Sequence, residues 1–175
     1  MAKLTVFSVP GLSARLLAEH AHELPNLQSL FAATVVVLDD ASPQQLETAL
    51  ISGILPEYHG RGVPLWDGIA AKVKTEFPLR EDWRAWARSD VHLDWQTHAL
   101  DLHAIDSAAR GHDALAVLSA YALVDGRPAG QDAHPLDRPV LLTRGFEQLK
   151  NWVGILEVAG ILRRALMEEI LTDAI

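Results

Sequence analysis

The sequence predicts an α/β protein with a mainly parallel open sheet that is flanked by helices. Two β-branched runs near the N-terminus, LTVFSV (residues 4–9) and ATVVVLD (residues 33–39), are typical of strands that are buried on both faces. The segments between them, SARLLAEHAHEL and LPNLQSLFA, carry apolar residues at helical spacing. Alternation of strands and helices favours parallel strands that are joined by helical crossovers.

The second half of the chain repeats this pattern. ALAVLSAYALV (residues 114–124) and PVLLT (residues 139–143) read as further buried strands, and the helical LDLHAIDSAARG precedes the first of them. The short VHLDW (residues 91–95) is a candidate for one more strand. Because 175 residues suit one sizeable core, we assign residues 1–175 to a single domain.

The C-terminal segment, residues 146–175, differs from the rest in its pattern. Residues 146–170 carry apolar side chains at helical intervals, which predicts one long helix or two, with Gly154 and Gly160 as weak points. The apolar stripe is wide and therefore needs a surface to pack on. Packing on the protein's own sheet is the favoured interpretation, and a homodimer interface through this segment is the alternative.

The composition disfavours several classes of partner. A net charge of −8 disfavours nucleic acid, whose phosphates need clustered Lys and Arg. No apolar run approaches the roughly 20 residues that a membrane span requires, and the N-terminal apolar run reads as a strand, not as a signal peptide. Disulfides and thiolate metal sites are excluded because the chain has no cysteine. We therefore expect a cytoplasmic protein.

The segment HLDWQTHALDLH (residues 92–103) offers candidate metal ligands. Its residues His92, Asp94 and His98 are of types that suit zinc or manganese. A carboxylate and an imidazole four residues apart can face one ion if the segment is a helical turn. Asp and His are also frequent in solvated loops, and Asp101 is alternatively the N-cap of the helix that follows.

Two further candidates lie before the helical segment QQLETALISG (residues 44–53). Ser42 followed by Pro43 is typical of an N-cap and a first helical residue, and the cap is the favoured interpretation. A nucleophilic serine at a helix N-terminus would occupy the same place. Asp39 and Asp40 end a predicted strand, where sites in open α/β sheets gather, although carboxylates there also serve as turn residues.

Five stretches of the sequence follow one another in an order that resembles the alkaline phosphatase superfamily. They are VFSVPGL, LPNLQSLF, ETALISGILPEYHG, HLDWQTH and VLSAYALVDGRP. The resemblance is to its nucleotide pyrophosphatase and type I phosphodiesterase branch, and it covers much of the first 145 residues. Ser52, Gly53, Pro56, His59 and Gly60 match the branch pattern Thr-Gly-x-x-Pro-x-x-His-Gly in spacing. The resemblance implies an alkaline phosphatase-like core, and two divalent metals that clamp a phosphate and activate a Thr or Ser nucleophile.

The chain departs from this family at the positions that carry the chemistry. Pro10 stands where the first strand of the family ends in Asp, and the nucleophile position falls on Pro43, one residue from Ser42. The metal-binding pair at the end of the later strand begins with Ala120. Proline and alanine side chains offer no ligand atoms to an ion.

Only Asp94 and His98 remain where the family has a metal-binding Asp and His, and one such pair does not build a two-metal site. The leading hypothesis is therefore a catalytically degenerate binding or interaction protein without a resident cofactor. In this hypothesis the loop that contains His59 and Gly60 has a structural role. The alternative is a metal-dependent phosphohydrolase for a small phosphate ester, with zinc or manganese in a rearranged site. That site would use Asp94 and His98 with Asp39, Asp40 or His92, and Ser42 as nucleophile.

Overall fold

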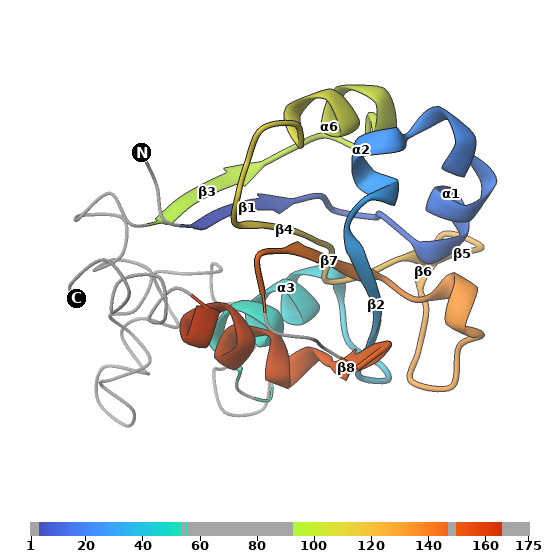
Figure 1. Cartoon of the computed structure of the whole chain (residues 1–175). Helices are drawn as coiled ribbons and strands as arrows, with labels where there is room; N and C mark the ends of the chain where they lie inside the picture. Colours follow the sequence, from blue (N-terminus) through green and yellow to red (C-terminus); the bar gives the residue numbers. More distant parts are fainter. Residues whose placement is uncertain (1–3, 54, 56–92, 147–149, 166–175) are drawn as a thin grey trace.

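A six-stranded sheet forms the centre of the computed structural model, in the strand order β3-β1-β4-β7-β2-β8 (Figure 1). The structure describes residues 4–53, 55, 93–146 and 150–165. Within these ranges the strands are β1 (Leu4–Ser8), β2 (Phe31–Val36), β3 (Leu93–Thr97), β4 (Leu115–Leu118), β7 (Val140–Arg144) and β8 (Trp152–Gly154). Strand β7 is antiparallel to β4 and β2, and the other pairs in the sheet are parallel. The predicted α/β class and mostly parallel sheet are thus confirmed.

Helices cover both faces of the sheet (Figure 1). One layer holds α1 (Ala14–Glu19), α2 (Pro25–Gln28) and α6 (Leu102–Ala108), and the other holds α3 (Pro43–Ser52) and the helical residues 158–165. Short 3-10 turns are η1 (Ala21–Glu23), η3 (Pro135–Asp137) and η4 (Ile155–Glu157), and a small hairpin pairs β5 (Leu123–Val124) with β6 (Arg127–Pro128).

Side chains alternate between the two faces of the sheet along each strand, and this alternation divides the core into two hydrophobic clusters. In β1, Leu4 and Val6 join the cluster under α3, whereas Phe7 joins the cluster under α1, α2 and α6. All three side chains are at most 1% exposed. Successive strand residues point to opposite faces, so a sheet with helices on both sides favours apolar residues on both faces of its central strands.

The C-terminal segment corrects one expectation. The helix predicted from residue 146 is wrong for residues 152–157, which form β8 and η4. Val153 pairs with Val35 in parallel register, so the sheet supplies the hydrogen bonds that override the helical spacing. Helical residues follow from 158 to 165, and residues 166–170 lie outside the described ranges.

The described helical part of this segment packs on its own sheet. Val158, Ala159 and Leu162 are at most 5% exposed, and Val158 and Leu162 belong to the cluster that contains Leu4 and Val6. The favoured intramolecular packing is therefore confirmed for these residues. No helix within the described ranges is long and apolar enough to cross a lipid bilayer.

Candidate functional site

The carboxyl ends of the parallel strands meet along one edge of the sheet, which we call the carboxyl edge. Strand β1 leads there to Pro10, β2 to Asp39, β3 to His98 and β4 to Ala120. Ligands of open α/β sheets bind at such an edge. The sequence therefore predicts the general position of these residues, and the hydrogen bonds decide what each of them does.

Ser42 is the N-cap of α3, as predicted. Its Oγ accepts a hydrogen bond from the backbone N–H of Gln45 at 3.2 Å, and Gln45 Oε1 accepts one from the Ser42 N–H at 2.9 Å. This capping box satisfies two backbone donors at once, and Pro43 at the first helical position fixes the backbone for the turn. The Ser42 side chain, the candidate nucleophile, thus has a structural role.

Asp39 and Asp40 shape the loops beyond β2. Asp39 Oδ1 accepts a hydrogen bond from the Gln131 N–H at 2.8 Å. The same oxygen lies so close to Gly130 that a Cβ there would be 2.5 Å away, so any side chain at this position would displace the Asp39 carboxylate. Asp40 has φ 54°, a left-handed conformation that Asp tolerates in turns.

Asp94 and His98 lie on or just after β3, not on the helical turn that we expected for a shared ion. The Gln96 side chain links them, because its Nε2 donates to Asp94 Oδ2 at 2.7 Å and its Oε1 lies 2.9 Å from His98 Nε2. In an extended strand, residues four apart share a face but are separated by about 13 Å, against about 6 Å on a helix.

The ring of His98 has a packing partner as well. It lies against Phe7, with the ring centroids 4.5 Å apart, and the backbone N–H of His98 donates to Ser8 O at 2.9 Å. Within the described residues, no group of three or more His, Asp or Glu is arranged to hold a metal ion. His92 and the loop residues Pro56, His59 and Gly60 lie outside these ranges.

Sequence reasoning missed the role of Ser119 at the end of β4. This serine is 1% exposed, and its hydroxyl donates to the Leu12 carbonyl and accepts from the Val140 N–H at 3.1 Å. It therefore ties the loop after β1 to β4 and β7. The sequence feature that could have indicated this role is the single hydroxyl that follows the apolar run of β4. A buried polar side chain in such a place needs hydrogen-bond partners inside the protein.

Glu47 and Tyr121 form a second feature that was missed. Burial raises the pKa of Glu47 in α3. Burial and the nearby Glu47 charge raise the pKa of Tyr121. No local sequence pattern predicts this pair, because a Glu in the second turn of a helix and a Tyr after a strand approach each other only in the fold.

Comparison with protein-family models, with curated proteins and with solved structures finds no match to this chain. The candidate site therefore stands on its own geometry, which is a strand-end edge with structurally engaged polar groups.

Proposed function

We propose that the chain is a catalytically degenerate alkaline phosphatase-like protein that acts as a binding or interaction module in the cytoplasm. The order of its motifs along a mostly parallel sheet supports the scaffold. One observation carries the loss of catalysis: the polar groups at the candidate site serve internal hydrogen bonds. Ser42 caps α3, Asp39 holds the Gln131 N–H, and Gln96 holds both Asp94 and His98.

The energetics support the same conclusion. A serine nucleophile needs a neighbouring base to accept its proton. Ser42 Oγ instead accepts a hydrogen bond from the Gln45 N–H, which is a donor and not a base. A metal site needs several ligands within about 2.0–2.2 Å of one point, and Asp94 and His98 are spread along an extended strand. Breaking each internal hydrogen bond to recruit its group would cost about 1 kcal/mol.

The partner class follows from charge and packing. The net charge of −8 opposes binding to nucleic-acid phosphates or to anionic membranes. A homodimer through the C-terminal segment would use the helix side chains that its packing leaves exposed. We assign no resident cofactor to the carboxyl edge.

A metal-dependent phosphohydrolase is the second candidate, since Asp94 and His98 share a strand face and Asp39 and Asp40 lie at the carboxyl edge. The test is an assay of the full chain with added zinc or manganese, on p-nitrophenyl phosphate and bis(p-nitrophenyl) phosphate. We expect turnover at the background rate for the parent and for Asp94→Ala alike.

The matched control is Asp113→Ala, which removes an exposed carboxylate before β4. Turnover well above background that Asp94→Ala abolishes and Asp113→Ala leaves intact would refute the binding-module proposal in favour of the hydrolase. Circular dichroism of each variant verifies that it is folded.

A further inference from the structure

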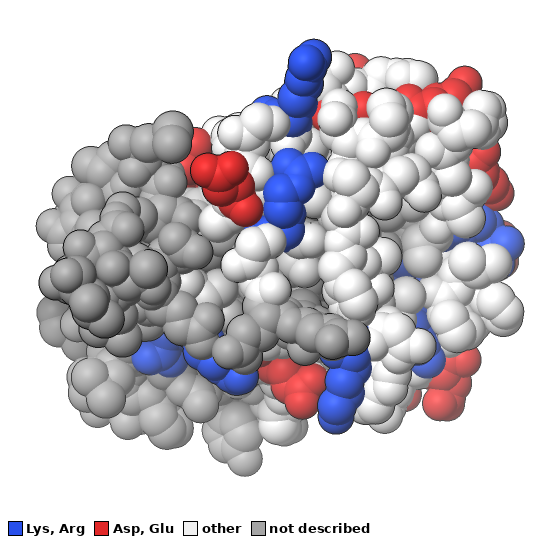
Figure 2. Space-filling model, viewed as in Figure 1, with Lys and Arg blue, Asp and Glu red and all other residues white. Residues whose placement is uncertain are grey.

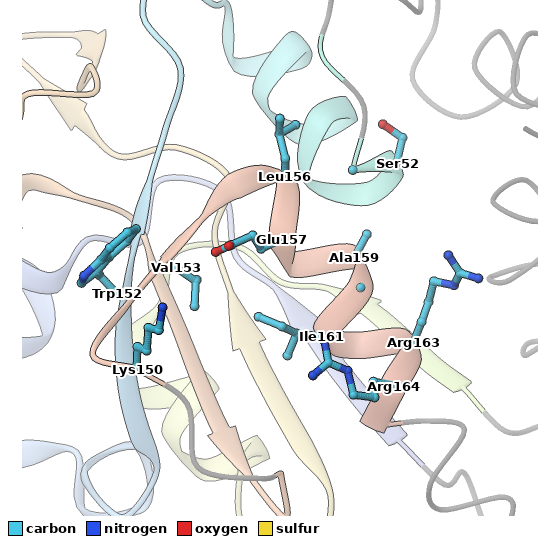
Figure 3. Close-up of a pocket in the computed structure, with 12 residues that line it drawn as sticks. Ser52, Lys150, Trp152, Val153, Leu156, Glu157, Ala159, Ile161, Arg163 and Arg164 are labelled. Carbon is cyan, nitrogen blue, oxygen red and sulfur yellow. The ribbon is translucent and has the colours of Figure 1, made fainter.

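A cleft of about 440 Å³ lies beside β8, the helical residues 158–165 and the C-terminal end of α3 (Figure 3). Its volume is within the range of about 300–1,000 Å³ that is usual for small-molecule sites. It meets α3 at Ser52 and Gly53, whereas Ser42 caps the opposite end of this helix. At 1.5 Å per residue, the helix separates the cleft from the carboxyl edge by about 15 Å.

Basic residues outnumber acidic ones in the lining of the cleft. Lys150, Arg163 and Arg164 line it, and Glu157 is the one acidic residue among the described residues of the lining. The Glu157 carboxylate accepts a hydrogen bond from the Gly154 N–H at 2.8 Å, so it is committed to capping the turn η4. In the space-filling view, Lys and Arg side chains lie on both sides of an acidic side chain along the lower edge of the molecule (Figure 2).

The two arginines offer N–H donors that no described residue occupies. Among the described residues, neither guanidinium makes a hydrogen bond or an ion pair. Figure 3 shows Arg164 reaching back toward Ile161, while Arg163 points away on the other side of the helix. A guanidinium presents several N–H donors in a fixed fork that fits phosphate and carboxylate oxygens.

An aromatic surface lies at the other end of the cleft. Trp152 is 49% exposed, and Lys150 Nζ lies 5.9 Å from its ring centroid. Apolar side chains, including Val153 and Ile161, lie between Trp152 and the arginines (Figure 3). An exposed indole beside an apolar floor can stack on a flat ring of a ligand.

We propose that this cleft binds a small organic anion with a planar aromatic ring. Its phosphate or carboxylate group lies against Arg164, the arginine that reaches toward Ile161, and its ring lies against Trp152. The exposure usual for arginine accounts for two arginines on a helix surface, but it does not account for an exposed tryptophan in the same concavity. The inference goes beyond the proposed function, because it holds whether or not the carboxyl edge is catalytic.

The test uses four probes and isothermal titration calorimetry on the full chain at low salt. 1-Naphthyl phosphate and 1-naphthoate carry both ring and charge, inorganic phosphate carries charge alone, and 1-naphthol carries the ring alone. We expect the two naphthyl anions to bind at least tenfold more tightly than phosphate or naphthol. The phosphate ester should be the tighter of the two, because it carries more negative charge at pH 7.

Variants assign the binding to the cleft. The double variant Arg163→Gln with Arg164→Gln should weaken both naphthyl anions at least tenfold, and Trp152→Leu should weaken them severalfold without changing phosphate binding. The control, Arg110→Gln with Arg127→Gln, removes the same charge from exposed positions outside the cleft and should change nothing. If the first double variant is unfolded by circular dichroism, the exposed Arg164→Gln alone replaces it.

Three results would overturn the inference. The first is that neither naphthyl anion binds at millimolar concentration, and the second is that both double variants weaken the affinity for the naphthyl anions equally. The third is that Trp152→Leu leaves this affinity unchanged. The outcome is separable from that of the proposed function. Catalysis at the carboxyl edge would appear as hydrolysis of 1-naphthyl phosphate, whereas 1-naphthoate has no ester bond and reports binding alone.

Discussion

The carboxyl edge and the cleft beside β8 differ in how their polar groups are used. At the edge, Ser42, Asp39 and Ser119 each hold a backbone group of another segment or of the following helix. In the cleft, Arg163 and Arg164 have no hydrogen-bond or ion-pair partner among the described residues. The first region is tied to the architecture of the protein, and the second is open to a ligand.

This difference shows why residue type alone is a poor guide to a site. Ser and Asp at strand ends suggest catalysis from their chemistry, yet an internal partner makes each of them costly to redirect. Charged side chains on a surface usually contribute little to stability, so evolution can vary them freely or use them for binding. Substitutions in the two regions should therefore differ in what they change.

The largest effect is expected at Ser119. Replacing it by alanine leaves the Leu12 carbonyl and the Val140 N–H without their buried partner. We expect Ser119→Ala to lower the free energy of unfolding by about 2–3 kcal/mol, measured by urea denaturation. The control is Ser107→Ala on the exposed side of α6, which should change it by less than about 0.5 kcal/mol. Equal effects of the two changes would contradict the assigned role.

A smaller effect is expected at the cap of α3. Ser42→Ala removes the acceptor of the Gln45 N–H and should cost about 1 kcal/mol, while Ser42→Gly should cost only a few tenths. For a chain of this size, 1 kcal/mol lowers the midpoint of thermal unfolding by about 2–4 °C. A loss for glycine as large as that for alanine would argue against a capping role.

Local signals predicted much of the fold. The β-branched runs of β1 and β2 and the caps Ser42 and Asp101 depend on near neighbours in the chain, and the structure confirms them, with Asp101 Oδ1 accepting from the Ala104 N–H at 3.2 Å. Strand β3 is confirmed as well, at Leu93–Thr97 in place of residues 91–95, although Val91 and His92 lie outside the described ranges.

Non-local pairing set the limit of prediction. The β8 residues lie within an apolar spacing that also fits a helix, and only the register with β2 decides between the two. The antiparallel direction of β7 is likewise a property of the sheet. The local structure of the candidate metal pair shows the same limit: a spacing of four brings two side chains together on a helix, but Asp94 and His98 lie along an extended strand and just after it.

Glu47 provides a pH-dependent test at the carboxyl edge. Burial raises its pKa, so between the ordinary carboxyl pKa and this raised value the folded protein binds more protons than the unfolded chain. Stability contributed by this group therefore falls as pH rises through that window. We expect Glu47→Gln to become more stable relative to the parent as pH rises from 4 to 7, measured by thermal unfolding.

The control for that series is Glu23→Gln on the surface. The hydrogen bond with His20 lowers the pKa of Glu23, so its contribution is present above the ordinary carboxyl pKa and is lost as pH falls. The two variants should therefore show pH trends of opposite sign. Parallel trends would mean that the environment of Glu47 is not desolvated as described.

The smallest effect on stability is expected in the cleft. Because Arg163 and Arg164 make no ion pair or hydrogen bond within the described residues, replacing both by glutamine should change the free energy of unfolding by no more than about 0.5 kcal/mol. The same variant should lose at least tenfold in affinity for 1-naphthoate. A loss of stability comparable with that of Ser119→Ala would place these arginines in the architecture, and the contrast between the two regions would then fail.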